Sequence, residues 1–110
     1  MNPSFPAKLP KPPYYAVIFP SVRTSTDEEG YQAMAETMTE RASKQPGFLG
    51  IESVRDEQGL GITVSYWTDE ASIANWKADG EHAQARKLGR EKWYGDFALR
   101  VAKVERAYSL

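Results

Sequence analysis

His82 is the one histidine of this 110-residue chain, and histidine is the side chain that titrates nearest to neutral pH. Its imidazole could take a proton from a phenolic substrate, or it could ligate heme iron through a ring nitrogen. A plainer interpretation is a partly exposed histidine that follows the Asp79-Gly80 break. Arg86 stands four residues later, so both side chains share one face of a helix. Its charge would lower the pKa of His82 and could stabilise an anion, although a solvated surface arginine is the simpler interpretation.

Aromatic residues are frequent, with three Trp, six Tyr and four Phe, and a small core does not need all of them. Trp76 lies at helical spacing from Ile73, so it either stacks on a flat ligand or packs in the core. A pocket wall does both. The candidates for the surroundings of a ligand are Trp76, Trp67, Tyr66 and Tyr31. The sequence leaves open which of them face inward.

Composition excludes several classes of site. Lys and Arg number 14 against 15 for Asp and Glu, which lacks the basic excess of a nucleic-acid binder. The chain has no cysteine, which excludes disulfides, thiolate metal sites and a cysteine nucleophile, and with one histidine we expect no metal centre. No apolar run approaches the ~18–20 residues of a membrane span. Residues 1–13 lack the apolar core of a secretory signal, so we expect a cytoplasmic protein.

Two segments make up the chain: a tail over residues 1–13 and a domain over residues 14–110. The tail holds five of the seven prolines, which predicts extended backbone outside the core, either loose or laid along a surface. Residues 14–19 are β-branched and aromatic, which predicts a strand that bulges or ends at Pro20, with pairing able to resume over residues 21–23. A helix follows, with Thr26 and Glu29 spaced as a capping box, and residues 45–47 stop it.

In the second half of the chain, a hairpin of two strands precedes the helical segment. Residues 48–55 and 62–67 alternate as two strands, and residues 68–70 begin a helical segment that breaks at Asp79-Gly80. A long last strand follows. Phe97, Leu99 and Val101 share one of its phases and Ala102, Val104 and Tyr108 the other. That change of phase predicts a bulge, or a strand whose halves pack on different partners.

The order β-α-β-β-α-β predicts an α+β, ferredoxin-like fold with an antiparallel sheet and helices on one face. The other face is left bare, and both phases of several strands carry apolar residues. We therefore expect a homodimer that packs sheet against sheet, with the long last strand contributing to it.

Several motifs resemble the antibiotic biosynthesis monooxygenase superfamily, in its common and mostly uncharacterised bacterial branch, over about residues 14–108. They are Gln45-Pro46-Gly47-Phe48-Leu49-Gly50, Ser65-Tyr66-Trp67-Thr68-Asp69-Glu70, Ile73-Ala74-Asn75-Trp76 with His82 nearby, Gly89-Arg90 with Trp93-Tyr94, and residues 100–106. The resemblance implies a dimeric α+β barrel with a pocket between the sheet and the helices of each unit. Members include cofactor-free oxygenases of aromatic polyketides and heme-degrading monooxygenases.

The heme-degrading branch places its iron-ligating histidine ten residues after the helix tryptophan. Counted from Trp76, that position here is Arg86, and the asparagine of the first strand is not evident. We therefore expect a cofactor-independent monooxygenase of a small aromatic or quinol-type molecule, with His82 as the base, Arg86 stabilising an anion, and Trp76 and Trp67 as pocket walls. The alternatives are a protein that binds heme, through His82, or another hydrophobic ligand, and a stress-associated dimer whose pocket is vestigial.

Overall fold

The structure is a computed structural model that describes residues 4–110, apart from the side chain of Glu81. Its elements are β1 (Tyr14–Arg23), α1 (Glu28–Ser43), β2 (Phe48–Arg55), β3 (Leu60–Trp67), α2 (Glu70–Ala78), α3 (Gly80–Leu88), the π-helical segment η1 (Gly89–Trp93), β4 (Tyr94–Phe97) and β5 (Arg100–Val104). The chain thus follows the predicted β-α-β-β-α-β order, with the last strand divided in two.

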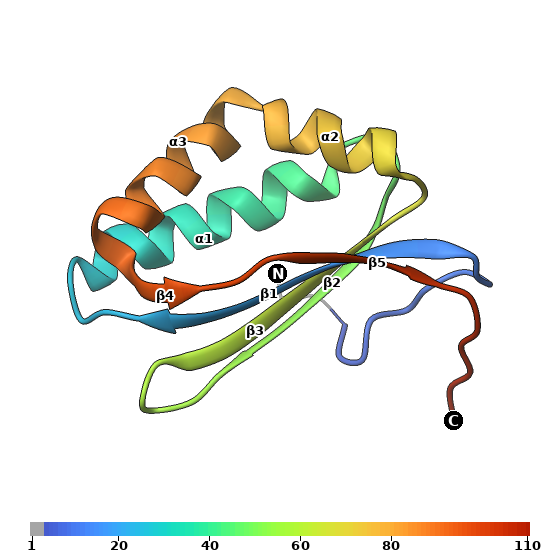
Figure 1. Cartoon of the computed structure of the whole chain (residues 1–110), viewed down its shortest axis with the longest axis horizontal. Coiled ribbons are helices and arrows are strands. Elements are labelled where there is room, and N and C mark those ends of the chain that lie inside the picture. Colours follow the sequence, from blue (N-terminus) through green and yellow to red (C-terminus); the bar gives the residue numbers. More distant parts are fainter. Residues whose placement is uncertain (1–3) are drawn as a thin grey trace.

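The strands form one antiparallel sheet in the order β2-β3-β1-β4, and β5 pairs with β1 as well. All the helices lie on one face of this sheet (Figure 1). The predicted ferredoxin-like α+β fold is confirmed. We call the face turned away from the helices the open face.

Strand β1 runs through Pro20 and does not end there, which corrects the expectation of a bulge or an end. The Pro20 carbonyl accepts a hydrogen bond from Ala98 N at 3.0 Å, and Ala98 lies between β4 and β5. The N–H and C=O of one residue in an antiparallel strand point to the same neighbour. The N–H group that proline lacks would therefore point to the interruption between β4 and β5, where strand pairing requires no donor.

The last strand is interrupted, but not at the predicted change of phase between Val101 and Ala102, where β5 pairs regularly with β1, and it is shorter than expected. Residues 98–99 separate β4 from β5, and β5 ends at Val104. Tyr108 lies beyond the sheet and is fully exposed, so it does not extend the strand.

Helix α1 begins with a different cap from the predicted one. Asp27 is the N-cap, and its Oδ1 accepts from Gly30 N at 3.2 Å, whereas the Thr26 N–H donates to Thr24 Oγ1. The predicted Thr26–Glu29 capping box is therefore wrong, because the helix starts one residue later. After the helix, Gly47 has a φ of +85° and turns the chain into β2.

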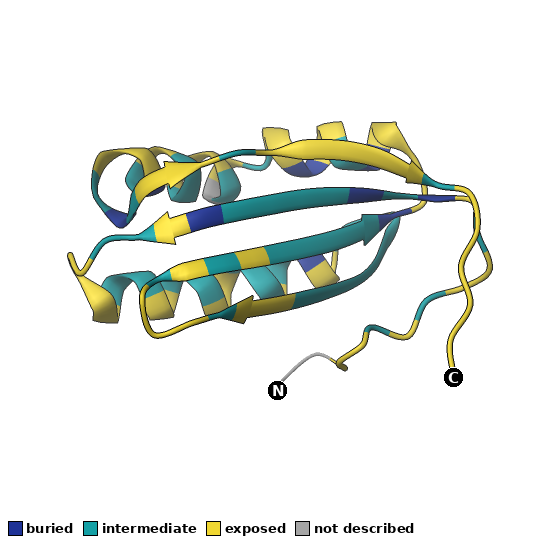
Figure 2. Cartoon of the chain, turned by 60° about the horizontal axis from the view of Figure 1, so that its bottom comes forward, coloured by how far each residue is buried: buried dark blue, intermediate teal, exposed yellow. Residues whose placement is uncertain are grey.

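Apolar residues lie on both faces of the sheet. On the helix side, Ala42, Trp67 and Trp76 form the buried core, and other apolar side chains pack against it. On the open face, Val54, Leu60 and Ile62 are 58%, 52% and 46% exposed. The exposed residues of the sheet lie toward the β2–β3 turn and along β4 and β5 (Figure 2). Among residues 4–110, no helix combines the length and apolar character needed to cross a membrane.

Candidate functional site

Three aromatic rings form a continuous stack between the sheet and helices α2 and α3. Trp67 at the end of β3 lies 6.4 Å from Trp76 on α2, with the rings 25° from parallel. Trp76 in turn lies 4.3 Å from the His82 ring on α3, at 11°. The structure therefore brings together three of the predicted site residues, from three different elements.

The break between α2 and α3 places His82 on this stack. Asp79 follows the last residue of α2, and its Oδ1 accepts from His82 N at 3.1 Å. The same carboxylate binds Arg41 on α1, with Oδ2 2.9 Å from Nη2. Asp79 thus fixes the start of α3 against α1, and the imidazole folds back over the Trp76 indole.

A hydrogen bond fixes which nitrogen of His82 carries the proton. His82 Nδ1 lies 2.9 Å from the carbonyl oxygen of Trp76, and a carbonyl can only accept. Nδ1 is therefore the protonated nitrogen of the neutral ring, and Nε2 keeps its lone pair. A lone pair on Nε2 is what a general base or a metal ligand needs.

The surroundings of His82 favour its neutral form. Burial lowers the pKa of the imidazole, and the charge of Arg86 lowers it further. The Trp76 carbonyl and the charge of Asp79 act in the opposite direction, but the net shift is downward. The predicted electrostatic effect of Arg86 on His82 is therefore present in the structure.

The guanidinium of Arg86 is hydrogen-bonded within the protein and is not available as a free cation. Its Nη2 donates to the Lys77 carbonyl at 3.0 Å, at the end of α2. Its Nε is buried and has no hydrogen-bond partner among the described residues. Arg86 therefore ties α3 to α2 and acts on His82 through charge.

Trp67 and Tyr66 do not lie where the sequence-based site placed them. Trp67 is fully buried, so it supports Trp76 from behind and is not itself a reachable pocket wall. Tyr66 lies on the open face, where its hydroxyl donates to Glu52 Oε1. Neighbouring residues of a strand point to opposite faces, so Tyr66 cannot share a helix-side pocket with Trp67.

Tyr31 belongs to a second cluster at the other end of α1. It precedes Ala42 of the core by 11 residues, which is about 16 Å of helix. The guanidinium carbon of Arg23 lies 3.8 Å from the centre of the Tyr31 ring, and Trp93 and Tyr94 pack edge-on against that ring. The structure therefore separates Tyr31 from His82.

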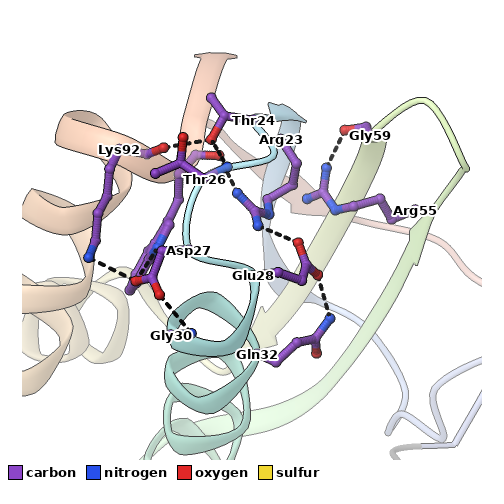
Figure 3. A network of polar contacts seen from close by, with 11 residues as sticks. Arg23, Thr24, Thr26, Asp27, Glu28, Gly30, Gln32, Arg55, Gly59 and Lys92 are labelled. Atoms are coloured by element: carbon purple, nitrogen blue, oxygen red, sulfur yellow. Dashed lines mark hydrogen bonds and ion pairs between the residues drawn. The ribbon is translucent and has the colours of Figure 1, made fainter.

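Polar contacts around Arg23 join β1, α1 and η1 (Figure 3). Arg23 donates to the Trp93 carbonyl at 2.6 Å and to Glu28 at 2.8 Å. Lys92 reaches Asp27 at 2.8 Å, next to the cap of α1. The network holds the π-helical segment against the start of α1.

Two arginines of this region were missed from the sequence. Arg23 and Arg55 both lie on the helix side of the sheet, and Arg55 donates to Ser21 Oγ at 2.8 Å. Arg23 has the same strand phase as Val17 of the core. A charged residue at an inward position of a strand was the signal that could have found it.

The structure describes a groove on the open face, away from the His82 stack. Its volume is about 510 Å³, and its lining includes Val22, Val54, Leu60 and Ile62. In the described part of the chain, no three or more carboxylates and imidazoles gather as they would around a metal ion.

Residues 13–88 match the antibiotic biosynthesis monooxygenase family. The chain belongs to this family. Among curated relatives, it is 53% identical over 102 residues to the uncharacterized protein YqjZ of Bacillus subtilis, across 93% of this chain and 89% of that protein. It is 29% identical over 94 residues to a jasmonate monooxygenase of Pyricularia oryzae, across 82% of this chain and 43% of that protein.

Solved structures share the fold of this family member at low identity. Rv0793 from Mycobacterium tuberculosis superposes with a TM-score of 0.75 at 12% identity, over 87% of this chain and 99% of that one. A crystal structure of an antibiotic biosynthesis monooxygenase gives 0.71 at 14% identity, over 82% and 97% of the two chains.

Proposed function

We propose that this chain is a monooxygenase that acts without a bound cofactor on a small aromatic or quinol-type substrate. Family membership supports monooxygenase-like chemistry, and the jasmonate monooxygenase relative supports it too. The observation that carries the proposal is the Trp76–His82 stack, in which a neutral imidazole whose Nε2 keeps its lone pair lies flat against an indole. The substrate, in this proposal, supplies the electrons.

His82 is the base of the proposed reaction. Nε2 takes a proton from an activated C–H or O–H bond of the substrate, and the resulting anion gives electrons to dioxygen. For a CH₂ group flanked by aromatic rings, one C=O bond replaces the two C–H bonds. One oxygen atom enters the product and the other leaves as water, so atoms and electrons balance.

The other residues of the stack have supporting roles in this proposal. Trp76 holds the His82 ring flat, because its indole lies between the rings of Trp67 and His82, and Trp67 holds Trp76 in place from the core side. Arg86 is a positioning residue, because its charge keeps His82 neutral and its hydrogen bond fixes α3 on α2.

The proposed assembly is a homodimer that uses the open face. The exposed apolar residues of that face support it, because burying them against a second copy is favourable. In a two-fold dimer the same patch of both subunits forms the interface, and an uncharged apolar patch can contact its own copy without charge repulsion.

Heme binding through His82 is the alternative, and the residues fit it poorly. The tenth residue after Trp76 is Arg86, which cannot ligate iron and whose guanidinium is bound to the Lys77 carbonyl. His82 offers one nitrogen, but the indole covers one side of its ring. We assign no step to heme.

Oxygen uptake tests the proposed activity. Purified wild type, His82→Ala and Gln84→Ala are compared with anthrone, with a substituted hydroquinone and with jasmonate. We expect His82→Ala to lose at least about 100-fold in kcat/KM, as removal of a general base does. Gln84→Ala changes an exposed residue of the same helix and should retain activity. Equal turnover by His82→Ala would show that the base is wrongly assigned.

Titration with hemin separates the alternatives. A Soret shift that saturates at one heme per subunit and is lost in His82→Ala would support the heme-binding alternative. Turnover of a quinol-type substrate without such a shift supports the proposal. If neither turnover nor a Soret shift is observed, the result favours the vestigial pocket.

A further inference from the structure

The open face is buried at one end and exposed at the other. Tyr14 and Ala16 of β1 are each 4% exposed, whereas Leu60 and Ile62 of β3 are 52% and 46% exposed. All four belong to the same face, since Ala16 pairs with Tyr66 and the others alternate in the same phase. Ala102 of β5 pairs with Ala16 and is exposed, so the cover over the start of β1 does not extend to β5.

Residues 4–13, which we call the strap, lie on this side of the sheet (Figure 1). A Cβ placed on Gly50 of β2 would lie 3.0 Å from Leu9 Cδ2 and 3.4 Å from Ala7 Cβ. Glycine at position 50 therefore leaves the space that the strap fills.

A carboxylate joins the strap to the sheet. Ala7 N donates to Glu52 Oε2 at 2.8 Å, and Tyr66 Oη donates to Oε1 at 2.5 Å. Tyr66 also packs edge-on against Tyr14 at 5.8 Å. A carboxylate on an apolar face is costly without donors, and here one donor comes from the sheet and the other from the strap.

The family match begins at residue 13, so nearly all of the strap precedes it.

We infer that the strap sets the limit of the surface on which a second copy binds. The second copy meets this chain over the strap-free apolar patch, which consists of Val22, Val54, Leu60 and Ile62, and against the outer side of the strap. This inference rests on the proposed homodimer. Without the strap, Glu52 loses one of its two donors and presents its charge to the second copy.

The first experiment measures the docking of the strap without reference to the dimer. Amide hydrogen exchange of Ala7 is followed in the full chain, in Gly50→Val and in Gly95→Val. We expect Ala7 to exchange at least tenfold more slowly than an unstructured amide, and Gly50→Val to abolish this protection. Gly95→Val is the matched control, because the nearest atom to its Cβ is 4.0 Å away. An unprotected Ala7 in the full chain would overturn the inference.

The second experiment measures the dimer. Sedimentation velocity compares the full chain with a chain that lacks residues 1–9, and circular dichroism checks that both are folded. We expect the deletion to raise the dissociation constant at least tenfold, and Glu52→Gln in the deleted chain, which removes the charge but keeps the length of the side chain, to lower it again. An unchanged or tighter dimer after the deletion would overturn the inference. A monomeric full chain would overturn it too, and protection of Ala7 would then show that the dimer had failed and not the strap.

Discussion

His82 packs flat against Trp76 and holds the carbonyl oxygen of the same residue with Nδ1. Both contacts come from one neighbour, so the ring orientation and the tautomer are fixed together. The proton on Nδ1 leaves Nε2 as the basic nitrogen, and burial keeps the ring neutral. At the scale of single residues, the site is one aromatic wall and one oriented base.

The pKa of His82 can be measured directly, because NMR of a chain with one histidine gives one imidazole titration. We expect the midpoint of this titration to lie below pH 6.5, so that at pH 6.5 most of the His82 rings are still neutral and able to accept a proton. Arg86→Gln should raise the midpoint, because a like charge is removed. Lys87→Gln removes the same charge one residue away and is the control; equal shifts in both variants would contradict a specific effect of Arg86.

The same shift links stability to pH. Between the folded pKa of His82 and 6.5, the unfolded chain binds more protons than the folded chain. The contribution of His82 to the free energy of unfolding is therefore complete above pH 6.5 and is lost as the pH falls below it. Urea titrations of wild type and His82→Gln at pH 7.5 and 5.5 should show a smaller loss in the variant. The opposite order would mean that the histidine gains a proton on folding.

Trp67 is the side chain whose loss should cost the fold most. It is fully enclosed and contacts both Phe48 and Trp76. We expect Trp67→Ala to lower the free energy of unfolding by about 3–5 kcal/mol, measured by urea denaturation. Tyr108→Ala alters a fully exposed aromatic and should change it by less than about 0.5 kcal/mol. A small loss in the free energy of unfolding of Trp67→Ala would show that the core is not built around Trp67.

Breaks and turns between the elements position the stack. The break at Asp79 separates α2 from α3, and His82 near the start of α3 reaches the carbonyl of a residue six positions before it in the chain. At the other end of the core, Gly47 brings β2 under the start of α2, with Thr68 N bound to its carbonyl at 2.8 Å. Helices α2 and α3 are short, at nine residues each, and such helices depend on these tertiary contacts.

Gly47→Ala tests the turn into β2. The residue has a φ of +85°, and an added Cβ would lie 2.0 Å from Ser72 Oγ. Backbone strain alone costs about 1–2 kcal/mol, so with the clash we expect a loss of at least about 2 kcal/mol in the free energy of unfolding. Gly80→Ala is the control, since nothing lies within 4 Å of its Cβ and alanine favours a helix. Similar losses at both positions would contradict this account of the turn.

At the scale of the whole molecule, the sheet has one face covered by helices and one that is covered only in part. The strap lies against Gly50 and Glu52 of β2, and the groove near the β2–β3 turn stays apolar and exposed. Exposed apolar patches of this kind mark interaction surfaces. The proposed site and the proposed interface therefore lie on opposite faces of the same sheet.

Ile62→Glu tests the interface. Its side chain is 46% exposed and lies beside Pro20 and Val54 on neighbouring strands. The subunit fold should survive, but each copy would bring an unpaired carboxylate into the apolar interface, so we expect a monomer at micromolar concentration by sedimentation. Ala74→Glu adds the same charge on exposed α2 and should stay dimeric. A dimer that persists in Ile62→Glu would exclude this face.

Much of the fold could be predicted from local patterns. The alternation in residues 48–55, the stop at residues 45–47 and the break at Asp79-Gly80 are signals carried by neighbouring residues, and the structure has an element boundary or a strand at each. The same reasoning could have separated Tyr66 from Trp67, because adjacent strand residues face opposite ways. Thr26 was mistaken for the cap because Asp27, next to it, is an equally good capping residue.

By itself, the sequence determined the order of the elements, the family and the absence of thiol chemistry, because these depend on residue types and short spacings. Only the tertiary structure decided which nitrogen of His82 keeps its lone pair, that Tyr31 lies in another cluster, and that the strap lies against β2 on the open face. The bond between Ala7 and Glu52 joins residues 45 positions apart, and no periodicity encodes such a contact. Contacts of this range exist only after the sheet and helices have packed, and both the proposed base and the proposed interface depend on them.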